Sequence, residues 1–203
     1  MEAVNICSII KDALLALSAV VVAFIAWQGL QTWRKELTGK ARFDCARKLM
    51  HLGFELRSNF SAARNPFGYA RIDRKGDENE REKESEVVNE WEARRIRANP
   101  LGESLNKIIE AQWEAEILLS GASSESVREA VQSYRECYGE LSSAIAEYFD
   151  TRLDEVRRNK IYKDQKWLTE LSKTIYGGPP DNFSKKIDEA TDKLSSTLKQ
   201  YVK

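Results

Sequence analysis

The stretch KDALLALSAVVVAFIAWQGLQTWRKE, residues 11–36, decides how the rest of the sequence is interpreted. Every residue from Ala13 to Trp27 except Ser18 is apolar, and the segment Ala13–Trp33 spans about 21 residues, or roughly 32 Å of helix. This length matches the ~30 Å hydrocarbon core of a bilayer. A helix on a soluble core shows one apolar stripe, whereas this segment is apolar on all sides. The stretch predicts a transmembrane helix over residues 13–33, and the alternative is a fully buried helix of a soluble protein.

The basic residues around this segment predict its orientation. Within about 15 residues of the segment, the N-terminal side carries only Lys11, and the C-terminal side carries Arg34, Lys35, Lys40, Arg42, Arg47 and Lys48. The positive-inside rule then places residues 1–12 outside the cell inner (plasma) membrane and residues 34–203 in the cytoplasm. A cleavable signal peptide fits less well, because its positive region would precede the apolar run.

The composition bounds the classes of partner and the size of the domain. The 203 residues carry 32 Lys and Arg against 32 Asp and Glu, so no general electrostatic attraction to nucleic acid is expected. About 170 residues follow the apolar segment, enough for one domain with a core. Cys7, Cys45 and Cys137 are scattered without the spacing of a disulfide framework or metal site, so we interpret them as packing residues.

Helical periodicity runs through the remainder of the chain. Apolar residues spaced by three and four form a continuous stripe from Trp33 to Ala63, which predicts a helix that continues directly from the membrane segment. Similar stripes predict helices that begin near Ser85, Val127 and Phe183. The expected fold is all-α, with one N-terminal transmembrane helix that continues into an antiparallel cytoplasmic helical bundle.

Proline, glycine and charged residues mark the predicted breaks between these helices. RNPFG at residues 64–68 stops the first stripe, and the charged segment over about 68–86 is expected to be a solvated loop, with a frayed helix extension as the alternative. Asp181 or Asn182 is expected to cap the last helix. Further breaks or bends are expected at the Asn99-Pro100 pair, at SGASSES (120–126), at Asn159 and at YGGPPDN (176–182).

The sequence carries no recognisable catalytic or cofactor-binding motif. It lacks the phosphate-binding loop, the dinucleotide fingerprint, the metalloprotease helix and the nucleophile elbow. His51, the only histidine, forms an H-x-x-x-E pair with Glu55, but two ligands are too few for a metal site. EARRIR at residues 92–97 is interpreted as a solvated face rather than a nucleic-acid contact. No catalytic residue, cofactor or metal is therefore predicted.

Glu116 interrupts the apolar pattern of its helix. The apolar direction of the helix that follows Leu101 also contains Gln112 and Glu116, and a carboxylate in such a position is costly unless it is paired. Helix direction favours Arg42 as the partner, and a shifted register would favour Arg57. We interpret the pair as a structural ion pair that fixes register, with a functional acid as the alternative.

A stripe of small residues runs along the apolar segment. Ala16, Ala19, Ala23 and Ala26 are spaced by three, four and three, which places them on one helix face. Small residues on one face allow two membrane helices to approach closely, so this pattern predicts self-association through the membrane helix. The alternative is that alanine is simply frequent in spanning helices.

Four phrases together resemble a known group of proteins. They are TWRKELTGKARFDCARKLM (32–50), RNPF (64–67), EAEILL (114–119) and YGGPPDNFSKKIDEA (176–190). The chain resembles an uncharacterised bacterial family in which a short N-terminal membrane helix precedes a cytoplasmic helical domain. The resemblance implies an inner-membrane location and brings no activity, cofactor or catalytic residue.

The leading functional hypothesis is a membrane-anchored helical interaction module that acts as a scaffold, adaptor or transducer. The alternatives are a membrane-tethered enzyme or defence-system effector without a recognisable motif, and an accessory subunit of a membrane complex. The expected partners are the lipid bilayer and one or more unidentified proteins, with a homodimer as a further hypothesis.

Overall fold

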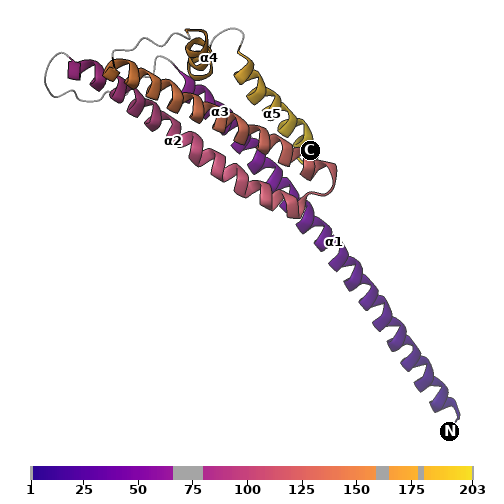
Figure 1. Cartoon of the computed structure of the whole chain (residues 1–203). Coiled ribbons are helices and arrows are strands. Elements are labelled where there is room, and N and C mark those ends of the chain that lie inside the picture. The colour runs from indigo at the N-terminus through magenta and orange to yellow at the C-terminus, as the bar shows by residue number, and fades with distance from the viewer. Residues whose placement is uncertain (1, 66–79, 159–164, 178–180, 203) are drawn as a thin grey trace. The chain divides into compact units, whose positions relative to one another are not determined.

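The computed structural model describes residues 2–65, 80–158, 165–177 and 181–202, which form helices and short turns without a strand (Figure 1). The helices are α1 (Glu2–Arg64), α2 (Glu80–Leu118), α3 (Ala122–Arg158), α4 (Gln165–Tyr176) and α5 (Asn182–Leu198), followed by a short 3-10 helix η1 (Lys199–Tyr201). The chain divides into two units, Met1–Phe43 and Asp44–Lys203. The prediction of an all-α chain is confirmed.

The N-terminal unit is helical and leaves its large apolar side chains exposed. Among the described residues, one helix is long and apolar enough to cross a membrane; its most apolar stretch has a mean hydropathy of 1.8, and none of that stretch is buried. Ser18 donates its hydroxyl to the carbonyl oxygen of Leu15 at 2.8 Å, so this polar group is satisfied within the helix. The exposed large side chains include Leu14, Leu15, Leu17, Val20, Val21, Val22, Phe24, Ile25, Trp27, Leu30 and Trp33.

The C-terminal unit is organised around one apolar core to which α1, α2, α3 and α5 contribute. Burying a large apolar side chain contributes about 1.5–3 kcal/mol, more than an exposed ion pair does, so this core dominates the stability of the unit. α1 and α5 approach closely at Gly53, where an added Cβ would lie 2.8 Å from Cδ2 of Leu194. The largest buried apolar side chains include Leu49, Leu56, Phe60, Leu101, Ile108, Tyr134, Leu141, Leu194 and Leu198.

Two glycines and one aspartate define helix ends as the sequence predicts. Gly121 has a φ of 59° between α2 and α3, and Gly177 has a φ of 77° after α4. This backbone region favours glycine, because a Cβ would be strained there. Asp181 is the N-cap of α5, and its carboxylate accepts a hydrogen bond from the backbone N–H of Ser184.

The break predicted at Asn99-Pro100 is wrong, and the loop predicted over about 68–86 is wrong for residues 80–86, where the alternative of a helix extension holds. α2 continues through Pro100, although a proline inside a helix removes a hydrogen bond and costs about 3 kcal/mol. Packing on α1 compensates for this loss, since Leu101 is fully buried and Asn59 of α1 donates to Oγ of Ser104 at 2.7 Å. The charged segment predicted as a loop is helical from Glu80 onward, because Glu, Lys and Arg are strong helix formers. Residues 66–79 and the bend predicted near Asn159 lie outside the described residues.

Candidate functional site

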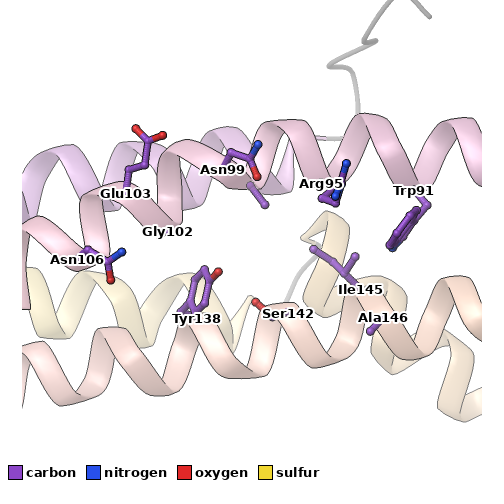
Figure 2. A pocket seen from close by; sticks show the side chains of 11 residues that line it. Trp91, Arg95, Asn99, Gly102, Glu103, Asn106, Tyr138, Ser142, Ile145 and Ala146 are labelled. Atoms are coloured by element: carbon purple, nitrogen blue, oxygen red, sulfur yellow. The ribbon is translucent and has the colours of Figure 1, made fainter.

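A groove of about 470 Å³ lies between α2 and α3. Figure 2 shows Trp91 of α2 near Ile145 of α3 at one end, and Tyr138 of α3 directed toward Gly102 of α2 further along. Ligand sites in proteins commonly have volumes of 300–1,000 Å³ and combine apolar walls with a few polar groups. The volume and the aromatic side chains of this groove fall within that description.

Small residues on both helices leave the space open. Ala98 and Gly102 line the groove on α2, and Ser142 and Ala146 line it on α3. A Cβ at Gly102 would lie 3.4 Å from the hydroxyl oxygen of Tyr138, so the absence of a side chain there gives the Tyr138 ring its place. The groove thus arises from a local run of small residues between two helices that are packed tightly elsewhere.

Polar side chains also line the groove between α2 and α3. Asn99, Glu103, Asn106 and Ser142 line the groove and are exposed, and within the described residues their side chains have no hydrogen-bond or ion-pair partner. The cation at the rim is Arg95, which lies 5.7 Å from the Trp91 ring centroid and 3.5 Å from the carboxylate of Glu92. The groove therefore offers donors and acceptors to a ligand without first breaking contacts inside the protein.

An acidic depression of about 560 Å³ adjoins the groove through a shared residue, Ala146. It is lined by Glu147, Asp150 and Asp154 of α3 and by Trp167 of α4. Glu147 and Asp150 are exposed, and no described cation pairs with their carboxylates. The continuous surface formed by the groove and this depression, here termed the α2–α3 groove, is apolar at one end and acidic at the other.

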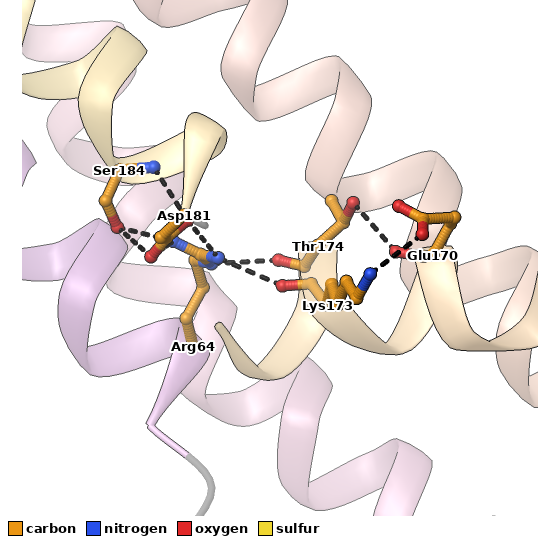
Figure 3. A network of polar contacts seen from close by, with 6 residues as sticks. All are labelled: Arg64, Glu170, Lys173, Thr174, Asp181 and Ser184. Carbon is orange, nitrogen blue, oxygen red and sulfur yellow. Dashed lines mark hydrogen bonds and ion pairs between the residues drawn. The ribbon is translucent and has the colours of Figure 1, made fainter. Parts of the chain in front are cut away.

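Arg64, the last residue of α1, is the centre of a buried polar network (Figure 3). Its side chain is 6% exposed, and its guanidinium donates five hydrogen bonds, the full number that its N–H groups allow. The acceptors are the carbonyl oxygens of Lys173 (3.1 Å) and Thr174 (2.8 Å), both carboxylate oxygens of Asp181 (3.1 and 3.0 Å) and Oγ of Ser184 (2.6 Å).

This network joins three helix ends. The carbonyls of Lys173 and Thr174 belong to the last turn of α4, and Asp181 caps the N-terminus of α5. The Lys173 carbonyl also accepts from the backbone N–H of Gly177 at 2.9 Å, so Arg64 is its second donor. Burial alone would raise the pKa of Asp181, but the hydrogen bonds from Arg64 and Ser184 outweigh it and lower the pKa to about 2. Asp181 is thus ionised and paired at neutral pH. We interpret the Arg64 network as structural.

Arg94 and Arg97 of α2 donate hydrogen bonds to the C-terminal end of α1. These contacts correct the interpretation of residues 92–97 as a solvated face. Arg94 is 2% exposed and donates to the carbonyl of Ala63 at 3.1 Å, while Arg97 donates to the carbonyl of Asn65 at 3.0 Å. Arg94 also lies 4.2 Å from the centre of the Tyr176 ring. Burial and the neighbouring Arg94 lower the pKa of Arg97. Cations at a helix C-terminus are favourable for both hydrogen bonding and the helix dipole.

Glu90 completes the contacts between α2, α3 and α4. Its carboxylate accepts from Nη1 of Arg152 at 2.6 Å and from the hydroxyl of Tyr176 at 2.7 Å. Burial and the bond to Glu90 raise the pKa of Tyr176 above its ordinary range, so Tyr176 remains a neutral donor. These contacts fix the position of α4 beside the acidic part of the α2–α3 groove.

Comparison of the chain with family models, curated proteins and solved structures finds no match. The resemblance to a bacterial family therefore stays a prediction.

Glu116 is not buried, which corrects the sequence prediction. Its carboxylate is exposed and accepts from Gln112 at 2.9 Å and from Arg128 of α3 at 3.2 Å, and these hydrogen bonds lower its pKa. Arg57 pairs with Asp188 of α5 at 2.7 Å instead of with Glu116. Arg42 belongs to the N-terminal unit. The acid therefore joins α2 to α3 at the surface.

The remaining candidate residues are placed as follows. Ala16, Ala19, Ala23 and Ala26 are exposed on the N-terminal helix, so their proposed role in self-association stays a prediction. His51 is exposed, and its ring lies 3.9 Å from the carboxylate of Glu55. Cys45 and Cys137 are free and buried, which confirms that these two are packing residues.

The α2–α3 groove was not predicted from the sequence. The signal that could have indicated it is the set of small residues Ala98, Gly102, Ser142 and Ala146.

Proposed function

We propose that this chain is a single-pass membrane protein that presents a cytoplasmic, antiparallel helical bundle to a protein partner. In this proposal the N-terminus lies outside the inner membrane, residues 13–33 cross it, and the bundle acts as a scaffold, adaptor or transducer. The observation that carries the proposal is the N-terminal helix, whose most apolar stretch has a mean hydropathy of 1.8 and has none of its length buried within the chain. The apolar side chains of this helix favour an apolar phase over water, and its length suits a bilayer, which supports the proposal.

The α2–α3 groove supports the part of the proposal that concerns a partner. Trp91 and Tyr138 supply aromatic surface, which is enriched at interfaces, and the surrounding amides and hydroxyls supply hydrogen-bonding groups. Recognition surfaces commonly place a few aromatic side chains at the centre of a polar rim. The groove likewise combines aromatic and polar side chains on one surface.

The test of the anchor is membrane fractionation of the full chain in bacteria. Wild type is expected to stay in the membrane pellet through an alkaline carbonate wash. The double variant Val21→Asp with Phe24→Asp is expected to be released, because each charge near the bilayer centre costs about 2.5–3.5 kcal/mol. The matched control is Phe54→Asp, which adds a charge at an exposed phenylalanine of the C-terminal unit and should leave the chain in the pellet.

The orientation is tested by reporter fusions after Lys203. A cytoplasmic reporter should be active there, and a reporter that works only outside the inner membrane should be silent. Wild-type chain in the soluble fraction would refute the anchor, and an active external reporter would refute the orientation.

A further inference from the structure

The α2–α3 groove has an apolar part and an acidic part, and together they restrict the chemical class of ligand that can bind. Trp91, Tyr138 and Ile145 form its apolar part, and Glu147 and Asp150 form its acidic part. The distance from Ser142 to Asp150 along α3 is about 12 Å at 1.5 Å per residue. A ligand that reaches from Ser142 to Asp150 must therefore span about 12 Å, which suits an extended or helical peptide segment.

The charge of the groove favours a cationic ligand. Glu103, Glu147 and Asp150 are exposed, and within the described residues no cation pairs with them. The cation at the rim, Arg95, is already beside Glu92 and over the Trp91 ring. Unpaired carboxylates attract a basic segment and repel an acidic one, so they contribute to the selection of a partner.

We propose that the α2–α3 groove binds a basic amphipathic peptide segment of a partner protein. An apolar side chain of the segment enters between Trp91 and Tyr138, and Lys or Arg side chains one to two helical turns away pair with Glu147 and Asp150. The asparagines and Ser142 hydrogen-bond the polar groups that border the apolar side chain. This inference rests on the proposed function, since it names the partner class of an interaction module. An anionic membrane surface is disfavoured as the occupant by the same carboxylates.

The test measures binding of a synthetic peptide to the full chain in uncharged detergent micelles. The probe is a fluorescent helix-forming peptide of leucine and lysine with the leucines on one face, and its binding is followed by fluorescence anisotropy. Empty micelles give the background. A second probe has glutamate in place of every lysine. We expect the lysine peptide to bind and the glutamate peptide to remain at the background.

Two pairs of variants locate the binding. Ser142→Trp fills the groove and should weaken binding at least about tenfold, whereas Ser58→Trp, at an exposed position of α1, should leave it unchanged. Glu147→Gln with Asp150→Asn removes two charges and should weaken binding about fivefold, the effect of two exposed ion pairs. Glu110→Gln with Asp192→Asn removes the same charge elsewhere and is the control. Thermal melts of all variants establish that each is folded.

The outcomes separate this inference from the proposed function. Three outcomes would overturn the inference, even where fractionation places the chain in the membrane. The wild type and folded Ser142→Trp could bind the lysine peptide equally, the lysine and glutamate peptides could bind equally, or no binding could rise above empty micelles. If the wild type doubles its mass in sedimentation and Ser142→Trp does not, a second copy occupies the groove and the inference of a separate partner is wrong. Release of the wild type from membranes would refute the anchor and leave the peptide measurement valid.

Discussion

Arg64 and Arg57 lie on the same helix and differ in burial, which makes them a matched pair for measurement. Arg64→Ala is expected to destabilise the protein by about 3–5 kcal/mol, because it leaves Asp181 and the carbonyl of Thr174 without their buried partner. Arg57→Ala removes an ion pair whose side chains are 50% and 47% exposed, and should cost less than about 1 kcal/mol. Urea unfolding of the purified full chain would compare them. Equal losses would refute the interpretation of the Arg64 network as structural.

Asp181 gives the Arg64 network a defined acid sensitivity. Its pKa is about 2 in the folded chain, below the ordinary value of 3.8, so the ionised carboxylate contributes stability above about pH 4 and loses it as the pH falls toward 2. The stability difference between wild type and Asp181→Asn should therefore be largest at neutral pH and shrink between pH 4 and pH 2. Because the Asp181 side chain is 32% exposed, we expect this pH-dependent part to be about 1 kcal/mol. A difference that stays constant over this range would contradict the assigned ion pair.

Glu116 lies outside the buried face of α2, although the apolar pattern of the sequence places it on that face. The apolar direction was set by large side chains, including Ile109, which is half-buried, while Ala111 and Ala115 are fully buried. Alanines pack where helices approach closely, so the true inner face of α2 is turned away from Glu116. Large side chains alone cannot reveal such a turn, because small buried residues carry little hydrophobic signal.

The N-terminal helix carries a prediction about self-association. If the alanine stripe forms a helix–helix contact, single cysteines at Ala19 and Ala23 should form disulfides in membranes, and single cysteines at Val21 and Ile25 should not, since small residues favour close approach. The background lacks Cys7, Cys45 and Cys137. Uniform or absent cross-linking at the four positions would refute a specific helix–helix contact through the alanine stripe.

Helix ends were predicted more reliably than helix interruptions. Gly121, Gly177 and Asp181 define ends through local backbone chemistry, which a sequence displays directly. Pro100 was misinterpreted because packing on neighbouring helices decides whether an unfavourable residue is tolerated. The charged run from Glu80 was misinterpreted because Glu, Lys and Arg form helices readily even where they bury no core. The α2–α3 groove was missed for a reason similar to that for Pro100, because it depends on which faces of α2 and α3 meet.

At the scale of the whole molecule, the two buried thiols should report on the opening of the core. Burial raises the pKa of Cys45 and of Cys137 to about 11, so both are thiols at neutral pH and shielded from reagents. In a Cys7→Ser background, both should be alkylated slowly and at similar rates, which rise together with urea as the shared core opens. A cysteine at exposed Ser58 provides the fast-reacting control. Rapid labelling of either native thiol without urea would contradict a single closed core.

The contact between Arg64 and Asp181 joins residues 117 positions apart in the sequence. At a synthesis rate of about 5–20 residues per second, a ribosome adds Asp181 about 6–23 s after Arg64. During that interval α1 has been made, but α5 is not yet available to cover the side of α1 that Gly53 opens toward Leu194. The face of α1 beside Gly53 is then open to other binding partners, so the order of synthesis is part of how the C-terminal unit closes.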